Sequence, residues 1–283
     1  MAPPSYGDLG KAARDVFGSG YHFGLVKLEL NTKTEDAINI TAGATLNQES
    51  GRVFGSLETR YKVKDYGMVF TERWNTDNAL STEISVENKI AQGLKMSLDT
   101  TFVPHSGKKS GRVKTAFKHD SVALNMDMNL GRGGPVINGS TVFGYNGWLA
   151  GYQMSYDYTK SKITKNNFAV GFTTNDFVVH SSVNDGEEYF ASLYQQLKPN
   201  LETGIQIAWS AGSADTRFEI GCKYQVGPLA SLRAKVDNSS RVGLAFQQKL
   251  SNGISMTMSA LIDGKSFYGG GGHKLGMSLD MAA

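Results

Sequence analysis

Residues 124–130 read LNMDMNL, an unbroken alternation of apolar and polar side chains. The even positions hold Leu and Met, and the odd positions hold Asn and Asp. Because successive side chains of a β-strand point to opposite faces, this period of two predicts a strand with one apolar and one polar face. The same period recurs in residues 94–99, 168–173, 254–260 and 274–281. We therefore expect a chain built mainly of such strands.

Clusters of Gly, Asn, Asp, Ser and Pro separate these runs, as in GRGGP at 131–135 and NDGEE at 184–188. Gly and Asn tolerate the positive φ that hairpin turns require. The pattern predicts roughly eighteen or nineteen strands, about 13–14 residues apart, which suits a barrel that spans a bilayer. No linker divides the chain. We expect one domain over residues 1–283, with a helix and glycine hinge at 1–24 and the barrel at 25–283.

The mean hydropathy of −0.29 does not exclude a membrane, because a transmembrane barrel alternates apolar and polar residues. No run reaches the ~18–20 apolar residues of a transmembrane helix. Small and polar residues dominate the second face of nearly every run, which favours a wide, water-filled lumen. A soluble two-sheet sandwich, with its apolar faces packed together, is the alternative.

Charge, cysteine content and motifs exclude several classes of protein. The formal net charge of +3 is too small for a protein that binds duplex nucleic acid. The single cysteine, Cys222, excludes an internal disulfide and fits a reducing compartment, and we interpret it as a packing or lipid-facing thiol. The N-terminus lacks the features of a secretory signal, so an uncleaved intracellular protein is expected. Five scattered histidines and the lack of GxSxG, Walker or GxGxxG motifs indicate no enzyme, no catalytic residues and no metal site.

The segment SYGDLGKAARDVFGSGYHFG (5–24) has a helical period instead. Ser5 is expected to cap a helix of about three turns, with Asp8 completing a short capping box. Its apolar stripe comprises Tyr6, Leu9, Ala13, Val16 and Phe17. Such a short helix must dock. Taken alone it also fits a mitochondrial presequence or a membrane-surface helix, and two acids weaken the first of these.

Inside a barrel, the stripe would rest on the wall and leave Lys11 and Arg14 facing permeating anions. A flexible hinge into the first strand is expected at Gly18, Ser19, Gly20 and Gly24.

The densest basic stretch is GKKSGRVKTAFKHD, from 107 to 120. Its alternation places Arg112, Lys114 and Lys118 on one face, opposite Val113 and Phe117. We expect these three cations to line the lumen, where they would raise the local concentration of anions. Lys108 and Lys109 are interpreted as a solvated turn.

Glu72 is an anomaly in YGMVFTERW (66–74). It shares its face with Met68, Phe70 and Trp74, whereas Arg73 takes the other face. If Arg73 faces the lumen, Glu72 faces hydrocarbon, where a charged carboxylate is costly and a proton or a partner becomes favourable. A glutamate at headgroup depth or a slipped register is the alternative.

Several stretches resemble the voltage-dependent anion channel, the porin of the mitochondrial outer membrane. They lie at 3–17, 55–67, 70–78, 144–154, 167–172 and 183–186, and in LIDGK and GGHKLGMSL near the C-terminus. The resemblance implies an all-β transmembrane barrel with a short amphipathic α-helix inside the pore. Barrels of this family have nineteen strands, so the strand count above is not independent of the resemblance. It also implies a voltage-gated, weakly anion-selective channel for ATP, ADP, phosphate and other small metabolites and ions.

The resemblance also implies particular sites. A weak dinucleotide site is expected at Arg241, Val242, Gly243, Ser259, Ala260, Leu261, Ile262 and Asp263. The sorting signal of mitochondrial outer-membrane barrels is matched by Lys274, Gly276, Leu279 and Met281, although an ordinary amphipathic last strand has the same pattern. Relatives often carry an apolar residue at position 241 and a lysine at position 19. Arg241 and Ser19 are therefore departures that we expect to alter nucleotide contact.

The partners implied are membrane lipids, ATP, ADP and small anions, hexokinase, apoptosis regulators and further copies of the chain. The matching glutamate in the family is tied to lipid handling and to partner docking, which gives Glu72 the same expected role. No cofactor is expected beyond weak ATP or NAD binding. Two other functions stay open, namely a mitochondrial protein-import pore of the same barrel superfamily and a soluble nucleotide-binding β-protein. An import pore would be expected to have a longer N-terminal segment and an acidic lumen, and the basic stretch argues against it.

Overall fold

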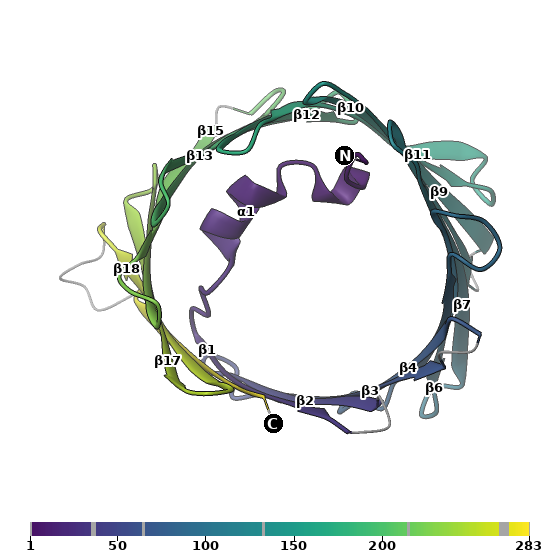
Figure 1. Cartoon of the computed structure of the whole chain (residues 1–283), viewed down its shortest axis with the longest axis horizontal. Coiled ribbons are helices and arrows are strands. Elements are labelled where there is room, and N and C mark those ends of the chain that lie inside the picture. The colour runs from purple at the N-terminus through teal and green to yellow at the C-terminus, as the bar shows by residue number, and fades with distance from the viewer. Residues whose placement is uncertain are drawn as a thin grey trace.

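The computed structural model describes residues 2–34, 38–63, 66–131, 134–213, 216–265 and 272–282. Nineteen strands form one sheet that closes into a barrel, and the N-terminal segment lies inside it (Figure 1). The predicted fold class is confirmed. No helix in the described part of the chain is long and apolar enough to cross a membrane.

The N-terminal segment contains a 3₁₀ turn, η1 (Tyr6–Asp8), and one α-helix, α1 (Lys11–Gly18). The strands are β1 (Leu25–Lys33), β2 (Ile38–Asn47), β3 (Val53–Val63), β4 (Met68–Asn75), β5 (Leu80–Glu87), β6 (Leu94–Val103), β7 (Lys108–Lys118), β8 (Val122–Gly131), β9 (Gly134–Tyr145), β10 (Trp148–Asp157), β11 (Lys162–Thr173), β12 (Phe177–Asn184), β13 (Glu188–Lys198), β14 (Leu201–Ser210), β15 (Thr216–Gln225), β16 (Ala230–Asp237), β17 (Arg241–Ser251), β18 (Ile254–Asp263) and β19 (Lys274–Ala282).

Consecutive strands pair antiparallel, and the barrel closes by a parallel pair of β1 with β19. Because the number of strands is odd and their direction alternates, the first and last strands run the same way. Val26 pairs with Met277 and Leu30 with Met281 across this seam. The closed sheet leaves no strand edge unpaired, which is what a membrane-spanning sheet requires.

The strand register places most of the large apolar side chains on the outside. Asn125 of β8 pairs with Ala116 and Ser140 on the lumen face, whereas Leu124 and Met126 point outwards and are 45% and 51% exposed. A soluble sandwich would bury such residues between its sheets, so that alternative is wrong. The outer wall has the apolar surface of a protein surrounded by lipid.

The hairpin between β9 and β10 shows why Gly and Asn in the sequence indicate turns. Asn146 and Gly147 both have positive φ, 48° and 86°. Two such residues in a row form the type I′ turn that matches the twist of antiparallel strands.

The N-terminal segment differs from the single helix predicted from Ser5. Gly10, at φ +66°, separates η1 from α1. A Cβ on Gly10 would lie 2.9 Å from the imidazole of His180, so this close approach requires glycine. Ser5 precedes η1, but its hydroxyl donates to the Asp8 carboxylate at 2.6 Å instead of accepting from a backbone N–H. The predicted capping box is therefore not formed.

Candidate functional site

The candidate site is the lumen face of the barrel together with the N-terminal segment. Figure 1 shows α1 near β13 and β18, on one side of the interior, with β4 and β7 across from it. Contacts join α1 to β13, β14 and β15, and join η1 to β9 and β10. The lumen therefore has one side lined by the N-terminal segment and one side of bare wall.

Two glycines form the seat of α1. Val16 and Phe17 are almost completely buried, and they lie over Gly204 of β14 and Gly221 of β15, which pair directly. A Cβ on Gly204 or Gly221 would lie 3.0 Å or 2.9 Å from the Phe17 ring. The helix can approach the wall this closely only because neither residue has a side chain.

Leu9 forms a second contact with the wall. It belongs to a small buried cluster with Ala123, Val142 and Ala169, and Tyr6 packs against this cluster. Together with Ala13, Val16 and Phe17, Leu9 is buried, whereas Tyr6 is half-buried. The stripe predicted from the sequence thus faces the wall.

Lys11 and Arg14 are both exposed, as expected of the polar side of the helix. Arg14 donates to the backbone carbonyl of Gly7. It also lines a cavity of about 590 Å³ between the N-terminal segment and the wall, together with Gln153, His180 and Arg217. Arg14 therefore faces this cavity, which the sequence did not indicate.

The predicted hinge is held at several points. Gly18 is the last residue of α1, and the Ser19 N–H donates to the Asp15 carbonyl at 3.2 Å. Gly20 and Gly24 have φ of +81° and +73°, so they make turns that other residues rarely adopt. We call residues 19–24 the linker.

The second half of the linker forms hydrogen bonds with the barrel wall. The backbone N–H of His22 donates to the Ser259 hydroxyl at 3.0 Å, and that of Gly24 donates to the Leu275 carbonyl at 2.9 Å. Burial raises the pKa of Tyr21 above its usual range. Burial, and secondarily the charge of Lys27, lower the pKa of His22. The linker is packed against the wall along its length.

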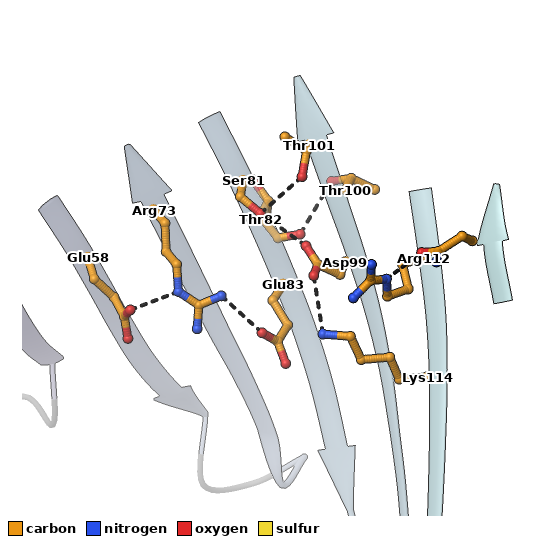
Figure 2. A network of polar contacts seen from close by, with 11 residues as sticks. Glu58, Arg73, Ser81, Thr82, Glu83, Asp99, Thr100, Thr101, Arg112 and Lys114 are labelled. Carbon is orange, nitrogen blue, oxygen red and sulfur yellow. Dashed lines mark hydrogen bonds and ion pairs between the residues drawn. The ribbon is translucent and has the colours of Figure 1, made fainter. Parts of the chain in front are cut away.

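Figure 2 shows a charged network on the opposite wall. Arg73 of β4 donates to Glu58 of β3 at 2.8 Å and to Glu83 of β5 at 3.3 Å (Figure 2). Asp99 of β6 accepts from Lys114 of β7 at 3.3 Å and from Ser81 at 3.0 Å (Figure 2). These groups are within reach because the register brings their strands side by side.

The three predicted lumen cations lie on this face with different partners. The Lys114 ammonium is paired with Asp99. Arg112 is exposed and donates to the Asn129 side-chain amide oxygen. Lys118 is exposed and has no ion pair among the described residues. The alternation over residues 94–99 places Asp99 on the polar face with Lys95, but it did not predict that Asp99 pairs with Lys114.

Glu72 lies on the outer face of β4, as its parity predicted. It pairs in register with Thr59 of β3 and Thr82 of β5, and it is exposed. No ion pair to Glu72 occurs among the described residues. Its surroundings are two hydroxyls and an apolar wall.

The residues expected at a dinucleotide site are adjacent but divided between two faces. Arg241 and Gly243 of β17 face the lumen and pair with Asp263 and Leu261 of β18, and Ser259 of β18 faces the lumen as well. The side chains of Val242, Ala260 and Ile262 point outwards, because positions alternate along the strands. One ligand in the lumen could therefore reach the side chains of only the first set.

Two of the lumen-side groups already have partners. The Arg241 guanidinium binds the Asp237 carboxylate at 2.7 Å, and the Ser259 hydroxyl is engaged by the linker. The dinucleotide site at these eight positions stays a prediction. The side chains that a ligand in the lumen could contact on β17 and β18 are fewer than the eight positions suggest.

The proposed sorting positions form β19. Lys274 faces the lumen and pairs with Glu49 at 2.8 Å. Gly276 lies directly against the His22 carbonyl, where a side chain would collide. Leu279 and Met281 point outwards at the seam with β1. Cys222, a free thiol, also takes an outward position, on β15.

Comparisons with known proteins agree with this geometry. A family model described as "Eukaryotic porin" matches residues 2–276. The "Voltage-dependent anion-selective channel" of Drosophila melanogaster is 54% identical over the whole of both chains. The "Non-selective voltage-gated ion channel VDAC2" of Homo sapiens is 52% identical, over 99% of this chain and 95% of that one.

Solved structures show the same fold. A mutant of the Rh. blastica porin superposes with a TM-score of 0.51 at 10% identity, covering 86% of this chain and 98% of that one. At this identity the likeness concerns the fold alone.

Proposed function

The chain belongs to the eukaryotic porin family, and from this premise we propose that it is a voltage-gated, weakly anion-selective channel. The observation that carries the proposal is the closed barrel, whose outer wall is apolar and whose polar lumen holds a helix. A wall of this kind separates lipid from water and leaves a path for hydrated solutes.

Selectivity follows from the balance of charges in the lumen. Many of its cations are neutralised by neighbouring acids, as Arg73, Lys114 and Lys223 are. Lys11, Arg112 and Lys118 have no carboxylate partner in the described part of the chain. Because a cation paired with an acid contributes little net field, the anion preference is expected to be weak. The solutes we propose are ATP, ADP, phosphate and other small metabolites and ions.

We place the channel in the mitochondrial outer membrane. The family and the apolar outer wall support an outer-membrane location. Transport without catalysis is proposed, with weak binding of ATP or NAD at most. Lipids, hexokinase, apoptosis regulators and further copies of the chain are the proposed partners, with Glu72 as a docking residue. The named relatives are ion channels, which favours this function over protein import.

A planar bilayer with purified protein tests the function. We expect stepwise conductance increases, a fall in conductance at high voltage of either sign, and a reversal potential that shows a small anion preference in a salt gradient. Protein that stays soluble without detergent and gives no conductance steps would refute the proposal.

A further inference from the structure

Two cations of the wall contact the C-terminal end of α1. The Arg233 guanidinium donates to the Asp15 carbonyl at 3.1 Å, and the Lys235 ammonium donates to the Phe17 carbonyl at 2.9 Å. Both residues belong to the lumen face of β16, where Lys235 pairs with Gly221 and Gly243 on the neighbouring strands. The contacts join residues that are far apart in the sequence.

The end of α1 needs such partners. The last carbonyls of a helix have no partner within the helix, and the helix dipole makes that end negative. The last turn of α1 contains no basic residue of its own. Arg233 and Lys235 thus supply from the wall the cations that a helix usually carries in its last turn.

Lys235 also holds the linker. Its ammonium lies 4.8 Å from the ring centroid of Tyr21 and 5.7 Å from that of Phe23. A cation over an aromatic ring is attracted by the ring's negative face, more strongly where water is excluded. One side chain thus contacts both the helix end and two aromatic residues of the linker.

Part of the Arg233 guanidinium is shielded from water. Its Nε is buried without a partner among the described atoms, and a Cβ on Gly20 would lie 3.3 Å from that same nitrogen. Arg233 as a whole is half-buried, and its Nε stays shielded from water for as long as Gly20 lies against it, which is costly for an unpaired donor. Hydration of this nitrogen therefore requires the linker to move away.

We propose that Arg233 and Lys235 are positioning residues that keep α1 docked in the lumen and so set the voltage at which the channel leaves its open state. We call this pair the latch. The voltage dependence rests on the proposed channel function, whereas docking itself does not.

The test removes the two latch cations. Arg233→Gln and Lys235→Met retain most of the side-chain volume and lose the charge. In planar bilayers we expect the closing voltage to move towards zero for each variant and further for both together. Arg233→Lys, which keeps a donor and a charge, is expected to recover most of the wild-type behaviour.

Lys223→Gln is the matched control. Lys223 faces the lumen on β15, beside Arg233 in register, but its ammonium pairs with Glu202 at 2.7 Å and does not touch α1. This variant loses the same charge from the same part of the wall. We expect it to alter selectivity like the latch variants and to leave the closing voltage near wild type.

A second measurement follows docking without current. In a Cys222→Ser background, nitroxide labels at Gly18→Cys and Ser110→Cys report the distance from α1 to β7 across the lumen in lipid vesicles. A Cβ at Gly18 would meet nothing within 4 Å, so a label fits there. We expect one narrow distance in the parent protein and an undocked population about tenfold larger for each latch cation removed, since tenfold corresponds to about 1.4 kcal/mol.

Unchanged distances in the folded double variant would overturn the latch, and so would an equal voltage shift in Lys223→Gln. If the parent protein does not conduct either, the proposed channel function fails, while the distances still decide whether the latch exists.

Discussion

Glu72 is the one acidic residue on the outward face of the described strands. Its parity could be read from the sequence, because the positions before and after it alternate without a break. Its neighbours in register, Thr59 and Thr82, could not be identified in that way. Two hydroxyls can donate to a carboxylate but cannot neutralise it. The position therefore keeps its electrostatic cost when lipid surrounds the wall.

Replacing Glu72 by Gln removes the charge and keeps the shape. We expect the free energy of unfolding in lipid vesicles at neutral pH to rise by about 1–3 kcal/mol, because charged residues on the lipid face of a barrel cost energy of this order. Urea unfolding followed by tryptophan fluorescence measures the change.

Glu87→Gln is the control for this variant, since Glu87 lies on the lumen face of β5 opposite Lys95. Its effect should stay within about 0.5 kcal/mol. A similar rise in both variants would mean that lipid is not what makes Glu72 costly. Unaltered lipid and partner binding by Glu72→Gln would count against a docking role.

At the scale of the element, strands and helix differ in how well they could be predicted. In a strand of this barrel, consecutive residues belong alternately to the apolar and the polar face, so the alternation alone identifies the strand. The break in the N-terminal helix depends on the ring of His180, on a strand distant in sequence. The stripe from Leu9 to Phe17 was identified correctly because it is a local pattern. The glycines that receive it were not, since nothing local marks Gly221 as a seat.

Gly221→Val tests whether this seat holds the helix. A side chain there would collide with the Phe17 ring, and overpacking of this kind costs about 1–3 kcal/mol. We expect trypsin to cleave the N-terminal segment after Lys11 and Arg14 about tenfold faster in bilayer-embedded protein, in line with the factor of ten per 1.4 kcal/mol.

The matched control is Gly139→Val on the outer face of β9, where a Cβ would meet nothing within 4 Å. Cleavage should keep its wild-type rate in this variant. Equal rates in all three proteins would show that the close contact between Phe17 and Gly221 does not determine docking.

For the whole molecule, the barrel and its inner and outer faces could be predicted, whereas the pairing of charges could not. Parity assigns Arg112 and Lys114 to the lumen, but a salt bridge depends on which residue of the next strand lies opposite. That register is set by turns and by the closure of the whole sheet. The pairing of Glu58, Glu83 and Asp99 with neighbouring cations was therefore found only in the structure, and these acids reduce the anion preference that the basic stretch alone would give.

Reversing the charge of two cations on β7 tests whether the balance of lumen charges sets the selectivity. In Arg112→Glu/Lys114→Glu, two cations become anions, and the new carboxylate at 114 lies beside Asp99 with no cation between them. We expect the reversal potential in a potassium chloride gradient to move to the cation-selective side, because the sign of the fixed charge determines which ion is concentrated in the lumen. Each single reversal should contribute a comparable part, since each changes the fixed charge of the lumen by the same amount and Lys114→Glu also leaves Asp99 without its cation. Raising the salt concentration should shrink the effect by screening.

The control for this reversal is Lys109→Glu. Lys109 lies on the outward face of the same strand, with its ammonium 5.6 Å from the Phe102 ring centroid. Lys109→Glu and Arg112→Glu therefore differ mainly in the side of the wall, outer or lumen, on which the new charge lies. If Lys109→Glu changes the reversal potential as much as Arg112→Glu, selectivity arises from the total charge near the pore mouth and not from the lumen face. If it does not, the alternation seen in residues 124–130 and repeated along β7 is what separates the groups that meet permeating ions from those that do not.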